Sequence, residues 1–237
     1  ILNSNLTGNV VTTGNQGILP TTGATQTITG NIGSSTSLDL NTLNIGSDTD
    51  ATNYSITTIN GNVFANSTVL NNNGTTNSSE LILASGKNIT STITTADANM
   101  GILTLAGGIQ TVTGQVGNGN KLAEVNAGNG TSTFANDVYA TNLDVEGTGT
   151  VNLDGKFTGT AVRYNADGTV ILADTKNIDS SVTTATNNTG TLSLEGSSTV
   201  TGQVGASGAS LKEINAGVAG TTSTFANDVY ATNTNIG

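Results

Sequence analysis

The side chains of this sequence that could do chemistry are almost all carboxylates. There are 16 Asp and Glu residues and six Lys and Arg residues, but no His, Cys or Trp. Without His or Cys, Ser-His-Asp and Cys-His catalysis, the usual zinc sites, thiol redox chemistry and common haem or iron-sulfur ligation are excluded. What remains is carbohydrate cleavage by paired carboxylates or cation binding by clustered acids.

The acidic residues are too scattered to favour either chemistry. Asp48 and Asp50 are close enough in sequence to approach one cation, but the spacing of known calcium-binding repeats is missing. We therefore interpret this segment as a turn with solvated carboxylates. Arg163 is the single Arg, so a lyase site that combines Asp clusters with basic residues is not indicated. The sequence predicts no enzyme activity, no metal site and no cofactor, and a carbohydrate-active β-helix enzyme is the alternative.

Two pairs of acidic residues recur at matching positions and are candidates for a repeated binding surface. Glu124 and Glu213 occupy matching positions in KLAEVNAG and SLKEINAG, and Asp137 and Asp228 both follow Asn in ANDVYA. A structural role is the alternative, because an Asp at a corner can accept hydrogen bonds from neighbouring backbone N–H groups.

Tyr139 and Tyr230 are the strongest binding candidates. They follow Val138 and Val229, which we expect to point inward, so the alternation of side chains along a strand predicts that both Tyr side chains point outward. Tyr is enriched in protein contacts. The sequence therefore predicts one contact surface in two copies.

The overall charge narrows the class of partner. The formal net charge is −10 and the pI is near 4.1. A nucleic-acid groove needs clustered Lys and Arg, and six basic residues spread over 237 positions cannot supply one. We expect no nucleic-acid partner.

The composition favours an elongated β-fold. Thr, Asn, Gly and Ser make up 54% of the chain, and aromatic residues only 3%. Many β-branched residues and few charges favour strands over disorder. A core with so few large side chains must be narrow, which an elongated fold allows and a spherical domain of this length does not.

The chain contains internal repeats. The segments that recur without a mismatch are STFANDVYATN, at 132–142 and 223–233, and TVTGQVG, at 111–117 and 199–205. A diverged copy precedes them, and the offsets between matching segments run from 84 to 91 residues. We predict one continuous β-solenoid over 1–237, made of repeats 1–80 (diverged), 81–169 and 170–237 (truncated).

Short strands alternate with corners inside each repeat. Apolar residues occur with period two in the pairs Leu103/Leu105, Leu143/Val145, Val151/Leu153 and Val170/Leu172. Gly and Asn clusters between them, such as Gly107-Gly108 and Gly147-Thr148-Gly149, predict corners with positive φ. No capped helical stripe is found, so we expect almost no helix.

Two architectures use many short strands. A right-handed parallel β-helix needs only a narrow aliphatic core, with about 20 to 25 residues per rung and with Asn or Thr stacked at its corners. Tandem β-sandwich modules are the alternative, although such modules usually have an aromatic-anchored core. Thr-X-Thr triplets also raise an ice-binding alternative, which is disfavoured because the triplet recurs about once per repeat instead of once per rung.

The repeated phrases resemble a known family. KNITSTITTADANMGILTL (87–105), TATNNTGTLSLEG (184–196), TVTGQVG and STFANDVYATN are similar to passages of the rickettsial surface cell antigens, autotransporters that include outer membrane proteins A and B. The resemblance implies an exported β-helical passenger on the outer, extracellular face of the bacterial outer membrane. This segment is not itself expected to insert in the membrane, because the implied anchor is a C-terminal β-barrel outside it. It further implies adhesion to a host-cell surface protein, or a surface layer formed with sister copies; a spacer without binding of its own is the alternative.

Overall fold

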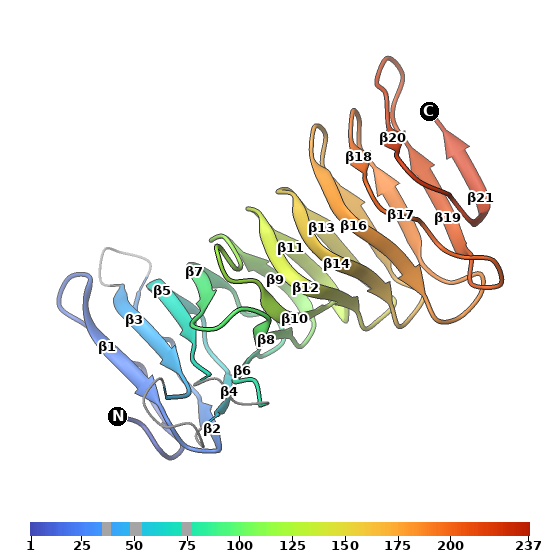
Figure 1. Cartoon of the computed structure of the whole chain (residues 1–237). Helices are drawn as coiled ribbons and strands as arrows, with labels where there is room; N and C mark the ends of the chain where they lie inside the picture. The colour runs from blue at the N-terminus through green and yellow to red at the C-terminus, as the bar shows by residue number, and fades with distance from the viewer. Residues whose placement is uncertain (35–38, 48–53, 73–76) are drawn as a thin grey trace.

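The strands of this protein stack along one axis into an elongated solenoid (Figure 1). The computed structural model describes residues 1–34, 39–47, 54–72 and 77–237. Within these residues the chain forms 21 β-strands and no helix, and all pairs of named strands are parallel. The predicted parallel β-solenoid is confirmed, and the antiparallel β-sandwich alternative is wrong.

The strands form two sheets in which neighbours alternate in chain order. The 11-stranded sheet consists of β1 (Gln16–Thr21), β3 (Leu40–Ile45), β5 (Val63–Leu70), β7 (Ile89–Thr95), β9 (Gly108–Val112), β11 (Gly130–Phe134), β13 (Thr150–Leu153), β15 (Thr169–Leu172), β17 (Thr191–Leu194), β19 (Leu211–Ala216) and β21 (Ala231–Ile236). The 10-stranded sheet consists of β2 (Thr25–Ile28), β4 (Ile56–Ile59), β6 (Glu80–Leu83), β8 (Met100–Leu105), β10 (Leu122–Ala127), β12 (Val138–Val145), β14 (Phe157–Tyr164), β16 (Asn177–Thr184), β18 (Thr199–Val200) and β20 (Thr224–Phe225).

Each turn of the chain crosses three faces, although the strands form only two sheets. The longest strands bend from one face to the next and so join two faces in one sheet. The register of β14 against β16 shifts between Thr158 and Ala161, where the strand turns a corner. The first face consists of β2, β4, β6, β8 and β10 and the C-terminal halves of β12, β14 and β16. The second face consists of β9, β11, β13, β15, β17, β19 and β21. The third face includes β1, β3, the C-terminal halves of β5 and β7, the N-terminal halves of β12, β14 and β16, and β18 and β20.

The core consists of stacked columns of inward side chains, and one column on each face runs through seven or more turns. The column of the first face contains Thr57, Leu81, Leu103, Val125, Leu143, Val162, Val182 and Val204. The column of the second face contains Ile32, Val63, Ile89, Val112, Phe134, Leu153, Leu172, Leu194 and Ala216. The column of the third face contains Thr68, Ile93, Val116, Val138, Phe157, Ile178 and Val200. All these side chains are buried, and the apolar pairs expected from period two are among the core residues.

The corners of the solenoid confirm the predicted stacking of Asn side chains, but they correct the predicted reason for glycine at one corner. The side-chain carbonyl of Asn9 accepts a hydrogen bond from the N–H of Asn31, Asn31 accepts from Asn62, Asn62 from Asn88 and Asn88 from Thr111, which is an asparagine ladder over four turns. Gly107 and Gly108 have the expected positive φ, but Gly147 and Gly149 do not. A Cβ on Gly149 would lie 2.1 Å from the carbonyl oxygen of Gly130 one turn away. The close approach of stacked turns, not φ, therefore requires glycine at that corner.

Candidate functional site

The two copies of STFANDVYATN lie on different faces of the solenoid. Phe134 lies in the column of the second face, whereas the matching Phe225 pairs with Val200 in the column of the third face. Val138 lies in the column of the third face, whereas the matching Val229 pairs with Val204 in the column of the first face. The second copy is therefore displaced around the axis by one face.

The length of the repeat explains this displacement. Four turns along the column of the second face lead from Phe134 to Ala216. Phe225, which matches Phe134 in sequence, lies nine residues beyond Ala216, and by then the chain has passed to the next face. The repeat thus spans four turns and one further face, and it brings Tyr139 and Tyr230 to different sides of the rod.

The local structure of the corner is the same in both copies despite this displacement. The side-chain amide of Asn136 donates to the carbonyl oxygen of Thr113 at 2.7 Å, and that of Asn227 donates to Thr201 at 2.6 Å. The backbone N–H of Tyr139 and that of Tyr230 donate to the matching carbonyl oxygens of the preceding turn, each at 2.7 Å. The sequence therefore encodes the corner, and the corner forms on whichever face the chain has reached.

Tyr139 is half-buried and already has contacts within the chain. Its hydroxyl donates to Oδ2 of Asp137 at 3.3 Å, and Nζ of Lys156 lies 5.1 Å from the centroid of its ring. Oδ1 of Asp137 accepts from the backbone N–H of Lys156 at 3.0 Å, which is the corner role proposed as the alternative for this residue. Contact with Tyr139, and then the charges of Asp137 and Asp179, raise the pKa of the Lys156 ammonium. One side of the Tyr139 ring is thus covered by a cation.

The second copy lies in the last turn of the described residues, and no further turn stacks over it. Tyr230 is half-buried and Asp228 is exposed. Val138 is completely buried, as expected. Val229 stacks on Val204 in the column of the first face, as expected for an inward residue, but 39% of it is exposed because no turn covers its other side. The two sets of candidate residues share a backbone conformation but differ in burial and in the cation above the ring.

The two candidate glutamates also differ in their contacts. Glu124 is half-buried on the first face, and its Oε2 accepts from Nη2 of Arg163 at 3.2 Å. Glu213 is half-buried on the second face, and its Oε1 accepts from the side-chain amide of Asn235 at 3.2 Å. The structure does not bring Glu124 and Glu213 together, and it gives them different neighbours.

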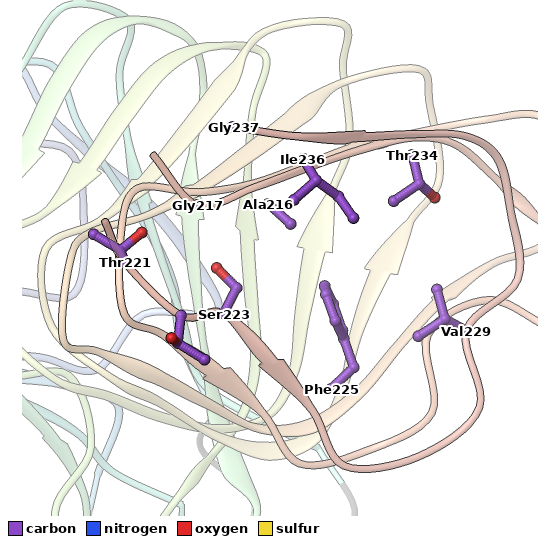
Figure 2. A pocket seen from close by; sticks show the side chains of 10 residues that line it. Ala216, Gly217, Thr221, Ser223, Phe225, Val229, Thr234, Ile236 and Gly237 are labelled. Atoms are coloured by element: carbon purple, nitrogen blue, oxygen red, sulfur yellow. The ribbon is translucent and has the colours of Figure 1, made fainter. Parts of the chain in front are cut away.

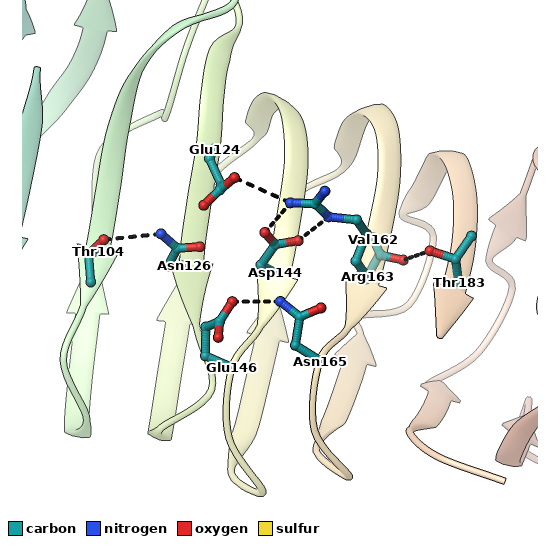
Figure 3. Close-up of polar contacts among 9 residues, drawn as sticks. All are labelled: Thr104, Glu124, Asn126, Asp144, Glu146, Val162, Arg163, Asn165 and Thr183. Atoms are coloured by element: carbon teal, nitrogen blue, oxygen red, sulfur yellow. Dashed lines mark hydrogen bonds and ion pairs between the residues drawn. The ribbon is translucent and has the colours of Figure 1, made fainter. Parts of the chain in front are cut away.

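The strongest polar contact on the first face was missed by the sequence reasoning (Figure 3). The Arg163 guanidinium makes two hydrogen bonds to the carboxylate of Asp144, whose side chain is only 3% exposed. Asp144 raises the pKa of Arg163, chiefly through these hydrogen bonds. The two residues are 19 positions apart, which is one turn, so the pairing could be found only once the length of that turn was known. This pair and Glu124 together balance part of the charge of one face.

Two cavities are lined by apolar, small and uncharged polar side chains. A cavity of about 590 Å³ at the C-terminal end is lined by Phe225, Val229, Ile236 and seven further small or hydroxyl-bearing residues (Figure 2). Its walls continue the three inward columns of the core. A second cavity, of about 330 Å³, is lined by Val11, Thr12, Thr13, Gln16 and Gly17. None of the lining residues of either cavity is titratable.

Acidic residues do not gather into a ligand set in the described part of the chain. No group of three or more His, Cys, Asp or Glu side chains is placed to hold a metal ion there. Asp48 and Asp50 lie outside the described residues. In the same part of the chain, no helix is long and apolar enough to span a membrane.

Comparison with known proteins gives one informative similarity. No protein-family model and no solved structure matches the chain. The chain is 34% identical to outer membrane protein A of Rickettsia rickettsii over an alignment 223 residues long, which covers 91% of the chain. It spans only 8% of the length of that curated relative. The comparison confirms the resemblance to rickettsial surface antigens of the outer membrane protein A type.

Proposed function

We propose that this chain is a non-enzymatic segment of an exported bacterial surface protein, an autotransporter passenger. Its work is to extend from the outer membrane as a stiff rod and to contact host-cell surface proteins, as an adhesin does. The similarity to a protein named outer membrane protein A supports a location at the outer membrane, and the elongated fold supports a role as an extended rod.

The observation that carries the proposal is the unbroken stack of parallel strands. Register pairs link the sheets from β1 to β19 and β21, and from β2 to β20. A stack of this kind distributes side chains over long outer faces and leaves its interior filled. The cavities of about 590 Å³ and 330 Å³ offer no carboxylate pair, which is what a carbohydrate-active β-helix enzyme would need.

The displacement of the repeat changes how such a rod can bind. Linked weak sites gain avidity only when both can reach the target together. Tyr139 and Tyr230 lie on different faces, so one flat target surface engages one of them at a time. The rod therefore binds through separate single contacts, one on the third face and one on the first face.

Adhesion of coated beads to host cells tests this proposal. Beads carrying the chain should bind cells, Tyr139→Ser and Tyr230→Ser should each lower binding in part, and the double variant should lower it most. The matched control is Thr183→Ser, an outward residue of the first face. If the double variant binds as well as the parent, the chain is a spacer and not an adhesive segment.

A second measurement tests the absence of catalysis. The chain is incubated with a panel of host and bacterial glycans, and new reducing ends or unsaturated products are followed over time. Steady product release that is lost on removing Glu124 or Asp137 would contradict the non-enzymatic reading.

A further inference from the structure

The sequence contains four Asn-Gly pairs, and the solenoid holds them in different ways. The pairs are Asn60-Gly61, Asn73-Gly74, Asn118-Gly119 and Asn129-Gly130. Asn is a chemically labile residue, and Gly as the next residue lacks the Cβ that would shield its backbone nitrogen. That nitrogen can attack the side-chain carbonyl carbon of the Asn when the peptide between the two residues is free to rotate. The pair at 73 and 74 lies outside the described residues.

Asn118 and Gly119 form the tip of a short hairpin at the corner between the third and first faces. Val116 before the hairpin lies in the column of the third face, and Leu122 after it begins β10 on the first face. The N–H of Asn118 donates to the carbonyl oxygen of Asn120 at 3.3 Å, and the N–H of Asn120 donates to that of Asn118 at 2.6 Å. With a φ of +68° at Gly119, the second bond closes a γ-turn of the rare kind with positive φ.

The tip of this hairpin is open, while its base is held by the preceding turn. Asn118 and Gly119 are exposed, and a Cβ on Gly119 would meet no atom within 4 Å. Neither the N–H of Gly119 nor the side chain of Asn118 is hydrogen-bonded to any residue that the structure describes. The side-chain amide of Asn120 donates to the carbonyl oxygen of Ala96 at 2.8 Å. The peptide between Asn118 and Gly119 can therefore rotate without displacing a stacked turn, and the hydrogen bond that this rotation breaks is the one inside the γ-turn.

The two other described pairs are held between stacked turns. Gly130 is the first residue of β11, and its backbone pairs with that of Gly108. A Cβ on Gly130 would lie 2.2 Å from the carbonyl oxygen of Gly108, and a Cβ on Gly61 would lie 2.2 Å from that of Gly30. Rotation of the peptide at either pair would therefore push against the backbone of a neighbouring turn.

We propose that Asn118 is a site of spontaneous deamidation in the folded chain, whereas stacking of turns protects Asn60 and Asn129. The backbone nitrogen of Gly119 attacks Cγ of Asn118, and the new C–N bond closes a succinimide ring. The side-chain nitrogen leaves as ammonia and takes with it the proton of the Gly119 N–H. Water then adds to one of the two ring carbonyls and opens the ring, which leaves an aspartate or an isoaspartate at position 118. The balance is one water consumed and one ammonia released, so the reaction needs no oxidant and no second protein.

The second copy of the repeat has a similar hairpin without the reactive pair. After the second TVTGQVG segment, Ala206 pairs with Ala209 across a tip made of Ser207 and Gly208. A Cβ on Gly208 would meet no atom within 4 Å, as at Gly119. The open tip therefore forms with or without Asn, and in the first copy it carries an amide next to Gly.

The reaction changes the surface beside the corner that contains Tyr139. Gly117 stacks on Tyr139, because a Cβ on Gly117 would lie 2.2 Å from the carbonyl oxygen of Tyr139. Deamidation of the next residue adds one negative charge to a chain whose formal net charge is −10, and the isoaspartate form lengthens the backbone of the turn by a methylene group. Val116 and Leu122 on either side are completely buried. We therefore expect the change to stay within the hairpin and the fold to be retained.

Peptide mapping by mass spectrometry measures deamidation at each pair. The chain is incubated at mildly alkaline pH, which speeds ring closure because the attacking nitrogen must lose its proton, once folded in buffer and once unfolded in guanidinium chloride. In the folded chain, position 118 should be modified several-fold faster than positions 60 and 129, and the three rates should converge in the unfolded chain. Equal rates in the folded chain would overturn the proposal. So would a folded chain in which Asn118 stays intact while the unfolded chain is modified at all three positions.

Two variants test whether stacking, and not exposure alone, decides the rate. Ser207→Asn and Thr148→Asn each place an Asn at an exposed position before a Gly. Gly208 is open, whereas the N–H of Gly149 donates to the carbonyl oxygen of Gly128 at 2.9 Å and its Cβ would lie 2.1 Å from a stacked carbonyl oxygen. We expect the new Asn to deamidate several-fold faster in Ser207→Asn than in Thr148→Asn, with circular dichroism confirming that both variants are folded. If Thr148→Asn is modified as fast, the local dipeptide decides the rate and the proposal is wrong. Both rates are measured on the isolated chain, so the result does not depend on host-cell adhesion.

Discussion

Replacing Val138 by Asp tests the inward and outward positions of the repeated segment. Val138 is completely buried in the column of the third face, between Val116 and Phe157. Burial of a Val side chain contributes about 2 kcal/mol, and an unpaired buried carboxylate costs several kcal/mol more. We expect Val138→Asp to lower the free energy of unfolding by about 4 kcal/mol or more, and the loss should shrink at acidic pH as the new carboxyl group protonates.

Two control positions lie in the same sequence context. Tyr139→Asp changes a half-buried outward residue, and Val229→Asp changes the same Val in the identical second copy, where 39% of the side chain is exposed. Both should cost much less, since their carboxylates stay hydrated. If Val138→Asp does not fold, Val138→Thr replaces it, with an expected loss of about 1 to 3 kcal/mol from the buried hydroxyl.

Urea unfolding followed by far-UV circular dichroism measures these differences. A solenoid can open locally before it unfolds globally, so amide exchange at Val116 and Phe157 should be followed as well. Equal losses for Val138→Asp and Tyr139→Asp would refute the assignment of inside and outside. A loss for Val229→Asp as large as that for Val138→Asp would show that local sequence, and not burial, sets the cost.

Three further predictions concern stacking, a buried phenol and an ion pair. Gly149→Ala should lower the urea midpoint clearly, because its Cβ would lie 2.1 Å from a stacked carbonyl oxygen, whereas the exposed Thr148→Ala should not. Burial raises the pKa of the Tyr164 phenol, which donates to a carbonyl oxygen at 2.5 Å, whereas an unfolded Tyr ionises near pH 10; stability should therefore be retained below pH 10 and fall as pH rises above it. Tyr164→Phe should remove this part of the pH dependence and cost about 1 kcal/mol at pH 7, as measured by urea unfolding across pH. Arg163→Met leaves a buried carboxylate without its partner and should cost about 2 kcal/mol in thermal or urea unfolding, whereas Lys212→Met at an exposed pair should change little.

The sequence alone determined the kind of fold. Period-two pairs such as Leu103/Leu105 predicted strands with one buried side, and the structure buries both residues. The scarcity of aromatic residues predicted a narrow core, and the Asn-rich composition predicted stacked corners. These features are local, because the alternation of side chains along a strand and the conformations open to Gly and Asn depend on near neighbours only.

Only the tertiary structure decided which residues share a face. The identical segments at Tyr139 and Tyr230 were expected to form one repeated surface, but they lie on different faces. The Arg163 and Asp144 pair is likewise set by stacking of turns and not by any local motif. The physical reason is that the face a residue occupies depends on the summed lengths of all strands and corners before it. A change of a few residues in one corner moves every later residue around the axis, while the local pattern that the sequence shows stays the same.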